Sequence, residues 1–253
     1  MTILLGRRTP TGTPPRERIE LDLEKTVAYA IGDVHGCLRE LVSLEGKIVE
    51  DAAGFGGRKL MILLGDYVDR GKDSARVVGH LLKPPPAGFR RICLAGNHEI
   101  AMLRFLDGEL PLEAWLALGG AETLYSYGLD PAHVARLYGD EADSYIRESI
   151  PPAHGEFLRG LPVMAYSRGM VFVHAGIRLG IPLHEQSESD LTTIRKDFLD
   201  NARDLDRWVV HGHTPVDFPR AEGRRIGIDT AAFRTGRLTA LRVSGQRGRL
   251  LFS

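Results

Sequence analysis

Three short motifs, each placed directly after a largely apolar run, constrain the fold of this chain more than any other feature. Their sequences are GDVHG at 32–36, GDYVDRG at 65–71 and GNHE at 96–99. The runs before them are typical of strands that are buried on both faces of a parallel sheet. Because ligands bind beyond the carboxyl ends of such strands, we expect the polar residues of all three motifs to meet at one edge of the sheet.

The polar residues of these motifs are suited to binding metal ions. Asp33, His35, Asp66 and Asn97 supply carboxylate, imidazole and amide donors, and no cysteine lies among them. Oxygen and imidazole donors without a thiolate favour divalent first-row metals over thiolate-bound clusters. The glycines beside them allow the backbone to turn sharply and to approach a ligand closely. The three motifs therefore predict a metal site.

Two further histidine segments follow apolar runs in the same way. His174 begins the sequence HAG after 170–173, and His213 lies in HGHT after 208–210. An isolated histidine is more often structural than a metal ligand, but the shared placement after strands favours a common site. His211 is open to two interpretations. It is either a further ligand or, as we prefer, a buried residue near the metals that does not bind them.

The pattern of the chain predicts an α/β fold. Helical spacing follows the first motif, a helix is expected over 73–82, and another begins at Asn97. Residues 107–160 are helical and aromatic in pattern, and we expect a helical insertion over one side of the site. Short strands after residue 160 predict a second sheet, which we expect to be antiparallel. The predicted architecture is a central β-sandwich flanked by helices.

Composition limits the cellular environments and the classes of partner that can be expected for this chain. The 33 acidic and 33 basic residues cancel, so no global field attracts nucleic acid or a membrane, and neutrality neither favours nor forbids oligomers. The two cysteines, Cys37 and Cys93, form no disulfide framework, which indicates a cytoplasmic location. No apolar stretch is long enough to span a membrane. Residues 1–25 are expected to form a partly disordered arm before one domain over 26–253.

Taken together, GDVHG, GDYVDRG, GNHE, HAG and GHT resemble the motifs of the calcineurin-like metallophosphoesterases, and more narrowly those of the bacterial branch of the phosphoprotein phosphatase family. The resemblance extends from about residue 26 to the C-terminus. It implies a four-layer fold and two divalent metal ions, for which we expect manganese, while iron and zinc also fit the donors. Pro215 occupies the place where many relatives have a second ligand histidine, a departure that the phosphatase branch shares.

The resemblance also implies a role for each candidate residue. Asp66 would bridge two cations, with the remaining ligands divided between Asp33 and His35 on one and Asn97, His174 and His213 on the other. Arg70, Arg195 and Asn97 would bind the substrate phosphate, although Arg195 also fits a solvated helix face. His98 would protonate the leaving group, oriented by Asp69, unless both residues only brace their loops.

The implied function is hydrolysis of phosphomonoesters. We expect a Ser/Thr protein phosphatase, in which a hydroxide shared by two cations attacks phosphoserine or phosphothreonine directly. The partner is therefore a phosphoprotein or a small phosphoester. Symmetrical diadenosine tetraphosphate hydrolysis is the alternative, because those hydrolases share most of the motifs; Asp69 and Glu99 favour the phosphatase. A catalytically silent phosphoprotein-binding module is a third, weaker interpretation.

Overall fold

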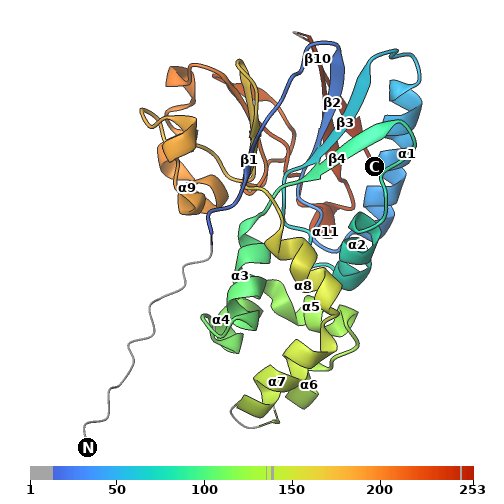
Figure 1. Cartoon of the computed structure of the whole chain (residues 1–253), viewed down its shortest axis with the longest axis vertical. Helices are drawn as coiled ribbons and strands as arrows, with labels where there is room; N and C mark the ends of the chain where they lie inside the picture. The colour runs from blue at the N-terminus through green and yellow to red at the C-terminus, as the bar shows by residue number, and fades with distance from the viewer. Residues whose placement is uncertain (1–13, 135, 138–139, 246) are drawn as a thin grey trace, which may run out of the picture.

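Two β-sheets packed face to face form the centre of the structure (Figure 1). The structure is a computed structural model that describes residues 14–134, 136–137, 140–245 and 247–253. Helices cover the outer face of each sheet, so the chain has the four-layer α/β architecture expected from its sequence. In Figure 1, α1 and α2 lie on one side of the sandwich and α9 on the other.

The first sheet contains the strands that precede the three N-terminal motifs. Its order is β11 (Arg247–Phe252), β10 (Thr239–Ser244), β2 (Thr26–Ile31), β3 (Arg58–Leu63) and β4 (Phe89–Cys93). β2, β3 and β4 are parallel, with Ala30 opposite Ile62 and Ile62 opposite Ile92. Their carboxyl ends therefore lie at one edge, as predicted. β10 joins this sheet antiparallel to β2.

The second sheet is mixed, so the expectation of an antiparallel sheet was wrong. Its order is β1 (Arg18–Glu20), β5 (Met164–Tyr166), β6 (Met170–Val173), β7 (Trp208–His211), β9 (Arg225–Gly227) and β8 (Ala221–Glu222). β6, β7 and β9 are parallel to one another, while β5 runs antiparallel to β6 and β8 runs antiparallel to β9. The segments between the parallel strands are long enough to cross over, which the short strands alone did not indicate.

β1 lies in the segment that was expected to form a partly disordered arm. Arg18–Glu20 pairs in parallel with Met164–Tyr166. Arg16 fixes the chain just before the strand, because its guanidinium donates to the carbonyls of Leu158 and Leu161. The ordered part of the chain therefore begins well before residue 26. Residues 1–13 lie outside the described residues.

Alternating side chains of β2 show how the layers are held together. Val27, Tyr29 and Ile31 face outward into a cluster with α1 (Leu38–Ala52) and α2 (Ser74–Leu81). Ala28 and Ala30 face inward and pack against the second sheet through Phe172 and Val210, among others. Their small side chains let the two sheets approach closely. Every residue of β2 is buried, as expected for a strand covered on both faces.

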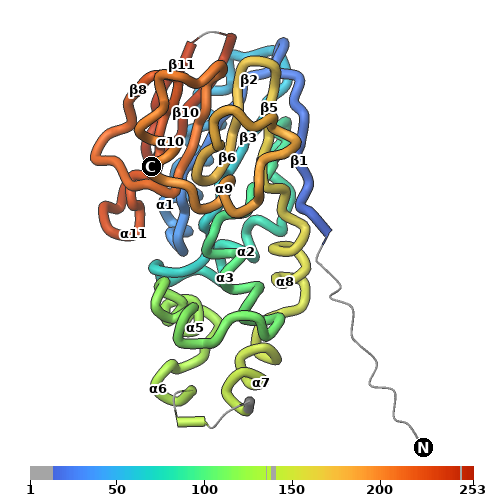
Figure 2. Tube along the Cα trace, turned by 90° about the vertical axis from the view of Figure 1, so that its left-hand side faces the viewer, coloured from blue at the N-terminus to red at the C-terminus, as the bar shows by residue number. Residues whose placement is uncertain are grey.

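The expected helical insertion is present as a group of short helices below the sandwich (Figure 2). α3 (Asn97–Leu106) leads into it from the third motif. The group then consists of α4 (Leu112–Trp115), a π-helical turn (Leu116–Gly120), α5 (Ala121–Ser126), α6 (Pro131–Val134), α7 (Asp140–Ser149) and α8 (Pro152–Arg159). It returns the chain to the second sheet at β5.

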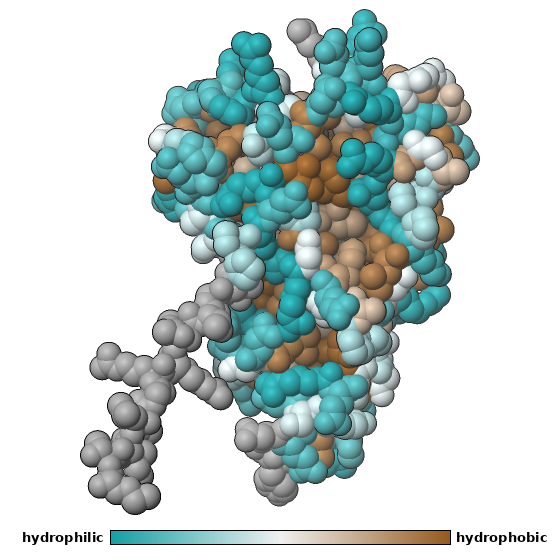
Figure 3. Space-filling view, in the orientation of Figure 1, coloured by the Kyte–Doolittle hydropathy of each residue, from teal (hydrophilic) through white to brown (hydrophobic). Residues whose placement is uncertain are grey.

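The remaining helices are short and lie near the second sheet and the C-terminal strands. They are a 3-10 turn (Leu183–Glu185), α9 (Glu188–Thr193), α10 (Lys196–Leu199), a second 3-10 turn (Ala202–Asp204) and α11 (Ala232–Thr235). Leu191 of α9 and Phe198 of α10 pack on the outer face of the second sheet. On the face shown in Figure 3, hydrophilic residues cover the outer flanks and hydrophobic residues show in the middle of the molecule.

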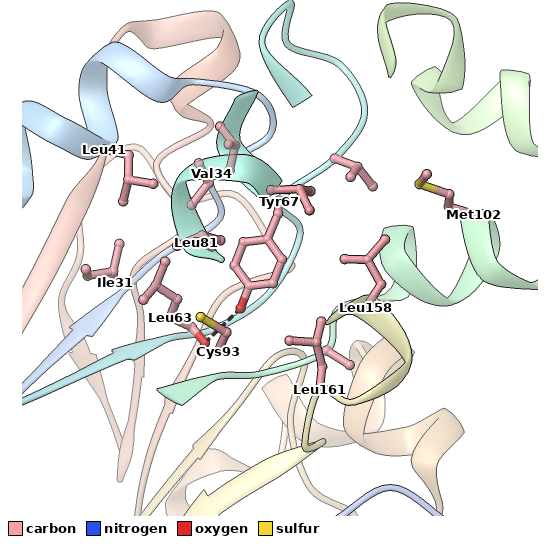
Figure 4. Packing of buried hydrophobic residues seen from close by; sticks show 14 of the residues in the cluster. Ile31, Val34, Leu41, Leu63, Tyr67, Leu81, Cys93, Met102, Leu158 and Leu161 are labelled. Atoms are coloured by element: carbon pink, nitrogen blue, oxygen red, sulfur yellow. Dashed lines mark hydrogen bonds between the residues drawn. The ribbon is translucent and has the colours of Figure 1, made fainter. Parts of the chain in front are cut away.

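Tyr67 connects the second motif to the core of the first sheet (Figure 4). Its ring is fully buried. Its hydroxyl donates hydrogen bonds to the carbonyl oxygens of Leu94 at 2.7 Å and Leu63 at 3.3 Å. Because the side chain lies under the loop that carries Asp66 and Asp69, this anchoring holds the loop against the ends of β3 and β4.

Candidate metal centre

The loops that follow five strands place the predicted donors in one buried region. Asp33 and His35 follow β2, Asp66 follows β3, and Asn97 follows β4, while the second sheet contributes His174 after β6 and His213 after β7. Five of these six side chains are at most 8% exposed, and Asn97 is partly exposed. The sandwich therefore brings together residues that lie far apart in the sequence.

Two groups of side chains have the spacing of a metal site, and they share Asp66. One group contains His35, Asp66 and His98, and the other contains Asp66, His174 and His213. Within each group the potential ligand atoms lie within 4.8 Å of one another. The two carboxylate oxygens of Asp66 divide between the groups, with Oδ2 3.4 Å from His35 Nε2 and Oδ1 3.4 Å from His174 Nε2. A carboxylate in this position is suited to bridge two cations.

The orientation of the histidines fits metal binding through Nε2. His35 Nδ1 contacts the carbonyl of Val68 at 2.8 Å, and His174 Nδ1 contacts the carbonyl of Leu64 at 3.0 Å. Such contacts fix each ring and place its Nε2 on the side of the Asp66 carboxylate. His213 Nε2 is buried and has no hydrogen-bond partner among the described residues. A buried nitrogen without a partner is unfavourable unless a ligand satisfies it, so the residues present fit a bound cation.

The remaining two predicted ligands lie at the border of these groups. Asn97 Oδ1 is 3.0 Å from His174 Nε2, so Asn97 adjoins the second group. The Asp33 carboxylate accepts the backbone N–H of His213 at 3.0 Å. It is tucked against Gly212, where a Cβ atom would collide with Asp33 Oδ1. Only glycine at this position allows the loop after β7 to approach the carboxylate.

Burial and charge determine the protonation of the site. Burial lowers the pKa of both His35 and His213 to about 3, and it also lowers the pKa of His174. These imidazoles are therefore neutral, which is the form that binds metals. Burial alone would raise the pKa of Asp66, but His174, His98 and His35 together hold that pKa below its ordinary value. The residue that the two groups share is thus a carboxylate anion.

The backbone of the motif loops is held in the left-handed region at several residues other than glycine. The φ angles are 41° at His35, 51° at Asp66, 69° at Asp69, 67° at Arg70 and 62° at His213. This conformation is unfavourable for residues with a side chain and persists only where the surroundings impose it. These left-handed residues are concentrated in the motif loops. The rest of the fold therefore stabilises an unfavourable backbone that positions these side chains.

His98, which belongs to the first of the two metal groups, forms a buried pair with Asp69. His98 Nδ1 is 2.7 Å from Asp69 Oδ2, and its Nε2 is 3.7 Å from Asp66 Oδ2. Burial alone would lower the pKa of His98, but Asp66 and Asp69 raise it above its ordinary value. The geometry places a histidine that can carry a proton next to the shared carboxylate of Asp66.

The helical insertion holds Asp69 from the other side. Thr123 of α5 donates from Oγ1 to Asp69 Oδ1 at 2.7 Å and accepts the backbone N–H of Asp69 at 2.8 Å. Trp115 of α4 donates from Nε1 to Asp69 Oδ1 at 3.1 Å. The backbone N–H of Arg70 donates to the carbonyl of Gly119 at 3.0 Å. The insertion therefore fixes the conformation of both Asp69 and Arg70.

The two predicted phosphate-binding arginines lie on different sides of the candidate metal centre. Arg70 Nη1 is 3.2 Å from His35 Nε2, and its guanidinium lies 5.3 Å from the ring centroid of Phe233. Arg195 precedes α10 and donates from Nη2 to the carbonyl of His213 at 3.4 Å. A guanidinium fork in either position is suited to a phosphate oxygen.

Two features of the site did not emerge from the sequence, namely the hydrogen bonds of Glu99 and the position of Asp229. Glu99 accepts the backbone N–H groups of Asp66, Tyr67 and Gly96 and thereby joins two motif loops. Asp229 lies just after β9 and close enough to Asp33 to raise that residue's pKa, to which burial contributes most. The signal for Asp229 was present, since an apolar run precedes it as it precedes Asp33.

His211 lies outside both metal groups. Its Nδ1 contacts the carbonyl of Gly212 at 2.9 Å, and its ring packs edge-on against Phe198 with the centroids 5.1 Å apart. Burial lowers the pKa of His211 to about 4. The geometry agrees with the preferred interpretation, in which His211 is buried near the centre and does not bind a metal.

A comparison of the whole chain with models of protein families shows which family it belongs to. The family model for calcineurin-like phosphoesterases matches residues 27–241. The chain belongs to this family. Its members are hydrolases that use divalent metals, in agreement with the candidate metal centre. No helix in the described part of the chain has the length and apolar character needed to span a membrane.

Curated relatives are similar over most of the chain. An asymmetrical bis(5'-nucleosyl)-tetraphosphatase PrpE from Geobacillus thermodenitrificans is 29% identical over 242 residues, covering 84% of this chain and 88% of the relative. The protein with the same name from Bacillus thuringiensis is 27% identical with the same coverage.

Solved structures support the fold. A candidate diadenosine tetraphosphatase has a TM-score of 0.64 at 20% identity, with 94% of this chain and 98% of that chain covered. A protein serine/threonine phosphatase from Saccharomyces cerevisiae has a TM-score of 0.59 at 15% identity, with coverage of 94% and 83%. Because the identities are low, these similarities concern the fold and do not distinguish between substrates.

Proposed function

We propose that the chain is a two-metal phosphomonoesterase and that its substrates are phosphoserine and phosphothreonine in proteins. The observation that carries this proposal is the buried His98–Asp69 pair at 2.7 Å beside the shared carboxylate of Asp66. The alkoxide of a phosphoserine leaves poorly without a proton, so such a substrate needs an acid at this place. A leaving group that is a weak base, such as a phenolate with an electron-withdrawing substituent, needs such an acid far less.

Each candidate residue has a defined part in this reaction. Asp33, His35, Asp66, Asn97, His174 and His213 would hold two divalent cations, for which manganese is our first expectation. When bound, the cations supply an activated water and neutralise phosphate charge. Arg70 and Arg195 bind the outer phosphate oxygens and orient the phosphorus. His98 donates its proton to the departing oxygen, while Asp69 keeps its ring in position.

A variant of the acid tests the proposal directly. We expect His98→Ala to reduce kcat on phosphoserine peptides about 10²- to 10⁴-fold, while kcat on 4-nitrophenyl phosphate falls much less, because nitrophenolate departs without a proton. The measurement is steady-state hydrolysis of both substrates with added manganese. His184→Ala, an exposed histidine outside the site, is the control. Equal losses on both substrates would remove His98 from the role of acid.

A second candidate function is hydrolysis of bis(5'-nucleosyl) tetraphosphates. It is favoured by the names of the relatives, which describe the asymmetrical reaction, whereas the motifs led us to expect the symmetrical one as the alternative. Incubating the purified protein with diadenosine tetraphosphate and with a phosphopeptide separates the two functions. The nucleotide products also distinguish the reactions, since the symmetrical one yields two ADP and the asymmetrical one yields ATP and AMP.

A further inference from the structure

A pocket of about 620 Å³ opens next to the candidate metal centre. Arg70 and Phe233 form the wall between them. Arg70 Nη1 is 3.2 Å from His35 Nε2, and the centroids of the Phe233 and His35 rings are 5.4 Å apart. A substrate whose reacting phosphate lies at the metals therefore has this pocket available for the rest of its structure. The volume is within the usual range for sites that bind small ligands.

The charges around the pocket leave an excess of positive charge. Two of its four basic residues form salt bridges with acidic residues of the same pocket. Arg39 lies 2.6 Å from Glu40, and Arg76 lies 2.8 Å from Asp73. Within the described residues, Lys72 and Arg70 have no carboxylate at ion-pair distance. Lys72 is exposed and lies two residues after Arg70 in the chain. The unpaired charges thus form a path that leads away from the metals.

Phe233 adds an aromatic surface to this path. Its side chain is 38% exposed although its neighbour Ala232 is buried in the core. The Arg70 guanidinium lies 5.3 Å from the Phe233 ring centroid, so a cation and an aromatic ring occupy the same wall of the pocket. Exposed aromatic rings beside positive charges are the surfaces on which nucleobases stack.

The geometry points to a subsite for the phosphate chain and base of a nucleoside polyphosphate. Lys72 binds the phosphates beyond the one at the metals, and Phe233 stacks against the base. This assignment rests on the second candidate function and names the part of the protein that would recognise its substrate. The two unpaired cations and the exposed ring of Phe233 suit a ligand that carries both a phosphate chain and a base.

Charge reversal at Lys72 tests the subsite by binding, independently of turnover. The ligands are an ATP analogue with methylene bridges, AMP and inorganic triphosphate, titrated calorimetrically into the manganese-loaded protein. We expect Lys72→Glu to weaken binding of the ATP analogue at least about tenfold, because a favourable charge contact becomes a repulsive one. AMP has no phosphates beyond the first, so its affinity is unchanged. Lys83→Glu, an exposed lysine just beyond the other end of α2, is the matched control.

Three results would overturn the assignment. If Lys72→Glu and Lys83→Glu bind the ATP analogue equally well, Lys72 does not contact the phosphate chain. If triphosphate binds as tightly as the analogue, or if a phosphopeptide with acidic flanking residues loses as much affinity in Lys72→Glu, the pocket does not recognise a nucleotide. Hydrolysis of 4-nitrophenyl phosphate by the unaltered protein checks the two-metal function separately, so its failure is distinguishable from failure of the subsite.

Discussion

Asp66 is the candidate ligand that belongs to both potential metal groups. Its backbone N–H is held by Glu99 at 2.8 Å, and its Oδ1 lies against Gly96, where a Cβ atom would collide with the carboxylate. The backbone at Asp66 is itself left-handed, with φ 51°. The single side chain is therefore fixed by its own loop and by the loop of the third motif.

Replacing this carboxylate tests whether it joins two cations. We expect Asp66→Asn to lower the metal content below that of the unaltered protein and to abolish most activity, because an amide is a weaker and uncharged ligand. Elemental analysis of protein reconstituted with manganese and then desalted measures the stoichiometry. Asp206→Asn, which alters an exposed carboxylate, is the control. Two tightly bound ions in Asp66→Asn would contradict a bridging role.

Among the structural elements, the helical insertion has the most direct effect on chemistry. Its helices α4 and α5 reach Asp69 through Trp115 and Thr123, and the turn between them reaches the backbone of Arg70. The insertion is thus more than a cover over the site. It completes the hydrogen bonds of the Asp69 carboxylate, which contacts His98, and it supports the left-handed backbone of the second motif.

A conservative change in the insertion separates positioning from folding. Trp115→Phe keeps the stacking against Phe105, whose ring centroid is 5.1 Å away, and removes only the N–H donor. We expect kcat on phosphoserine peptides to fall about tenfold, since a hydrogen bond to a charged group contributes about 1.5–3 kcal/mol. Activity on 4-nitrophenyl phosphate should change little. Trp208→Phe, which changes a partly exposed tryptophan, is the control. Equal loss on both substrates would indicate a merely structural role.

The contact between α1 and the first sheet includes a network centred on Asp51. Its carboxylate accepts hydrogen bonds from Tyr29 at 2.8 Å, Arg242 at 2.8 Å and Arg249 at 2.9 Å. Burial alone would raise the pKa of Asp51, but the bonds from Tyr29 and Arg242 hold that pKa below its ordinary value. Because the pKa of Asp51 is lower in the folded than in the unfolded state, its ionised carboxylate stabilises the fold.

This network predicts a pH-dependent difference in stability. At pH 7 we expect Asp51→Asn to reduce the free energy of unfolding by about 2 kcal/mol through weakened charged hydrogen bonds. The contribution is fully present above the unfolded-state pKa of about 3.9 and is lost as pH falls through the lower folded-state value, so the difference should shrink there. Urea denaturation of both proteins at several pH values measures it, with Asp200→Asn as an exposed control. A difference that stays constant across this window would contradict the network.

For the whole molecule, the packing of the two sheets decides whether a metal centre exists. Candidate ligands from the first sheet meet His174 and His213 from the second only while the layer between the sheets remains intact. Phe172 is fully buried in this layer. A change there alters the distance between the two halves of the centre without touching any ligand.

Truncating this side chain tests the link between packing and the site. We expect Phe172→Ala to reduce the free energy of unfolding by about 3–5 kcal/mol, because a large buried ring is replaced by a cavity. Manganese affinity should fall with it, as the two sheets lose their fixed spacing. Val42→Ala on the exposed face of α1, at a side chain 49% exposed, should change stability by no more than about 0.5 kcal/mol. Unaltered manganese affinity in Phe172→Ala would show that the centre tolerates loosened packing.

The sequence by itself determined the parts of this protein that depend on local pattern. Apolar runs identified β2, β3 and β4, and the polar residues after them predicted which edge of the sheet bears the site. The same logic found His174 and His213, because donors that follow buried strands have few other uses. Asp229 follows the same rule, but it was not recognised as a candidate although a strand was expected before it.

Tertiary structure alone decided which side chains complete the site and how the second sheet pairs. Trp115 and Thr123 are typical helix residues in the sequence, and nothing local shows that they meet Asp69, whose loop lies far from them in the chain. The parallel pairing of β6 with β7 likewise depends on how the crossover packs, which short strands do not encode. Local pattern fixes what each segment prefers, whereas contacts between distant segments form only when all the layers pack at once.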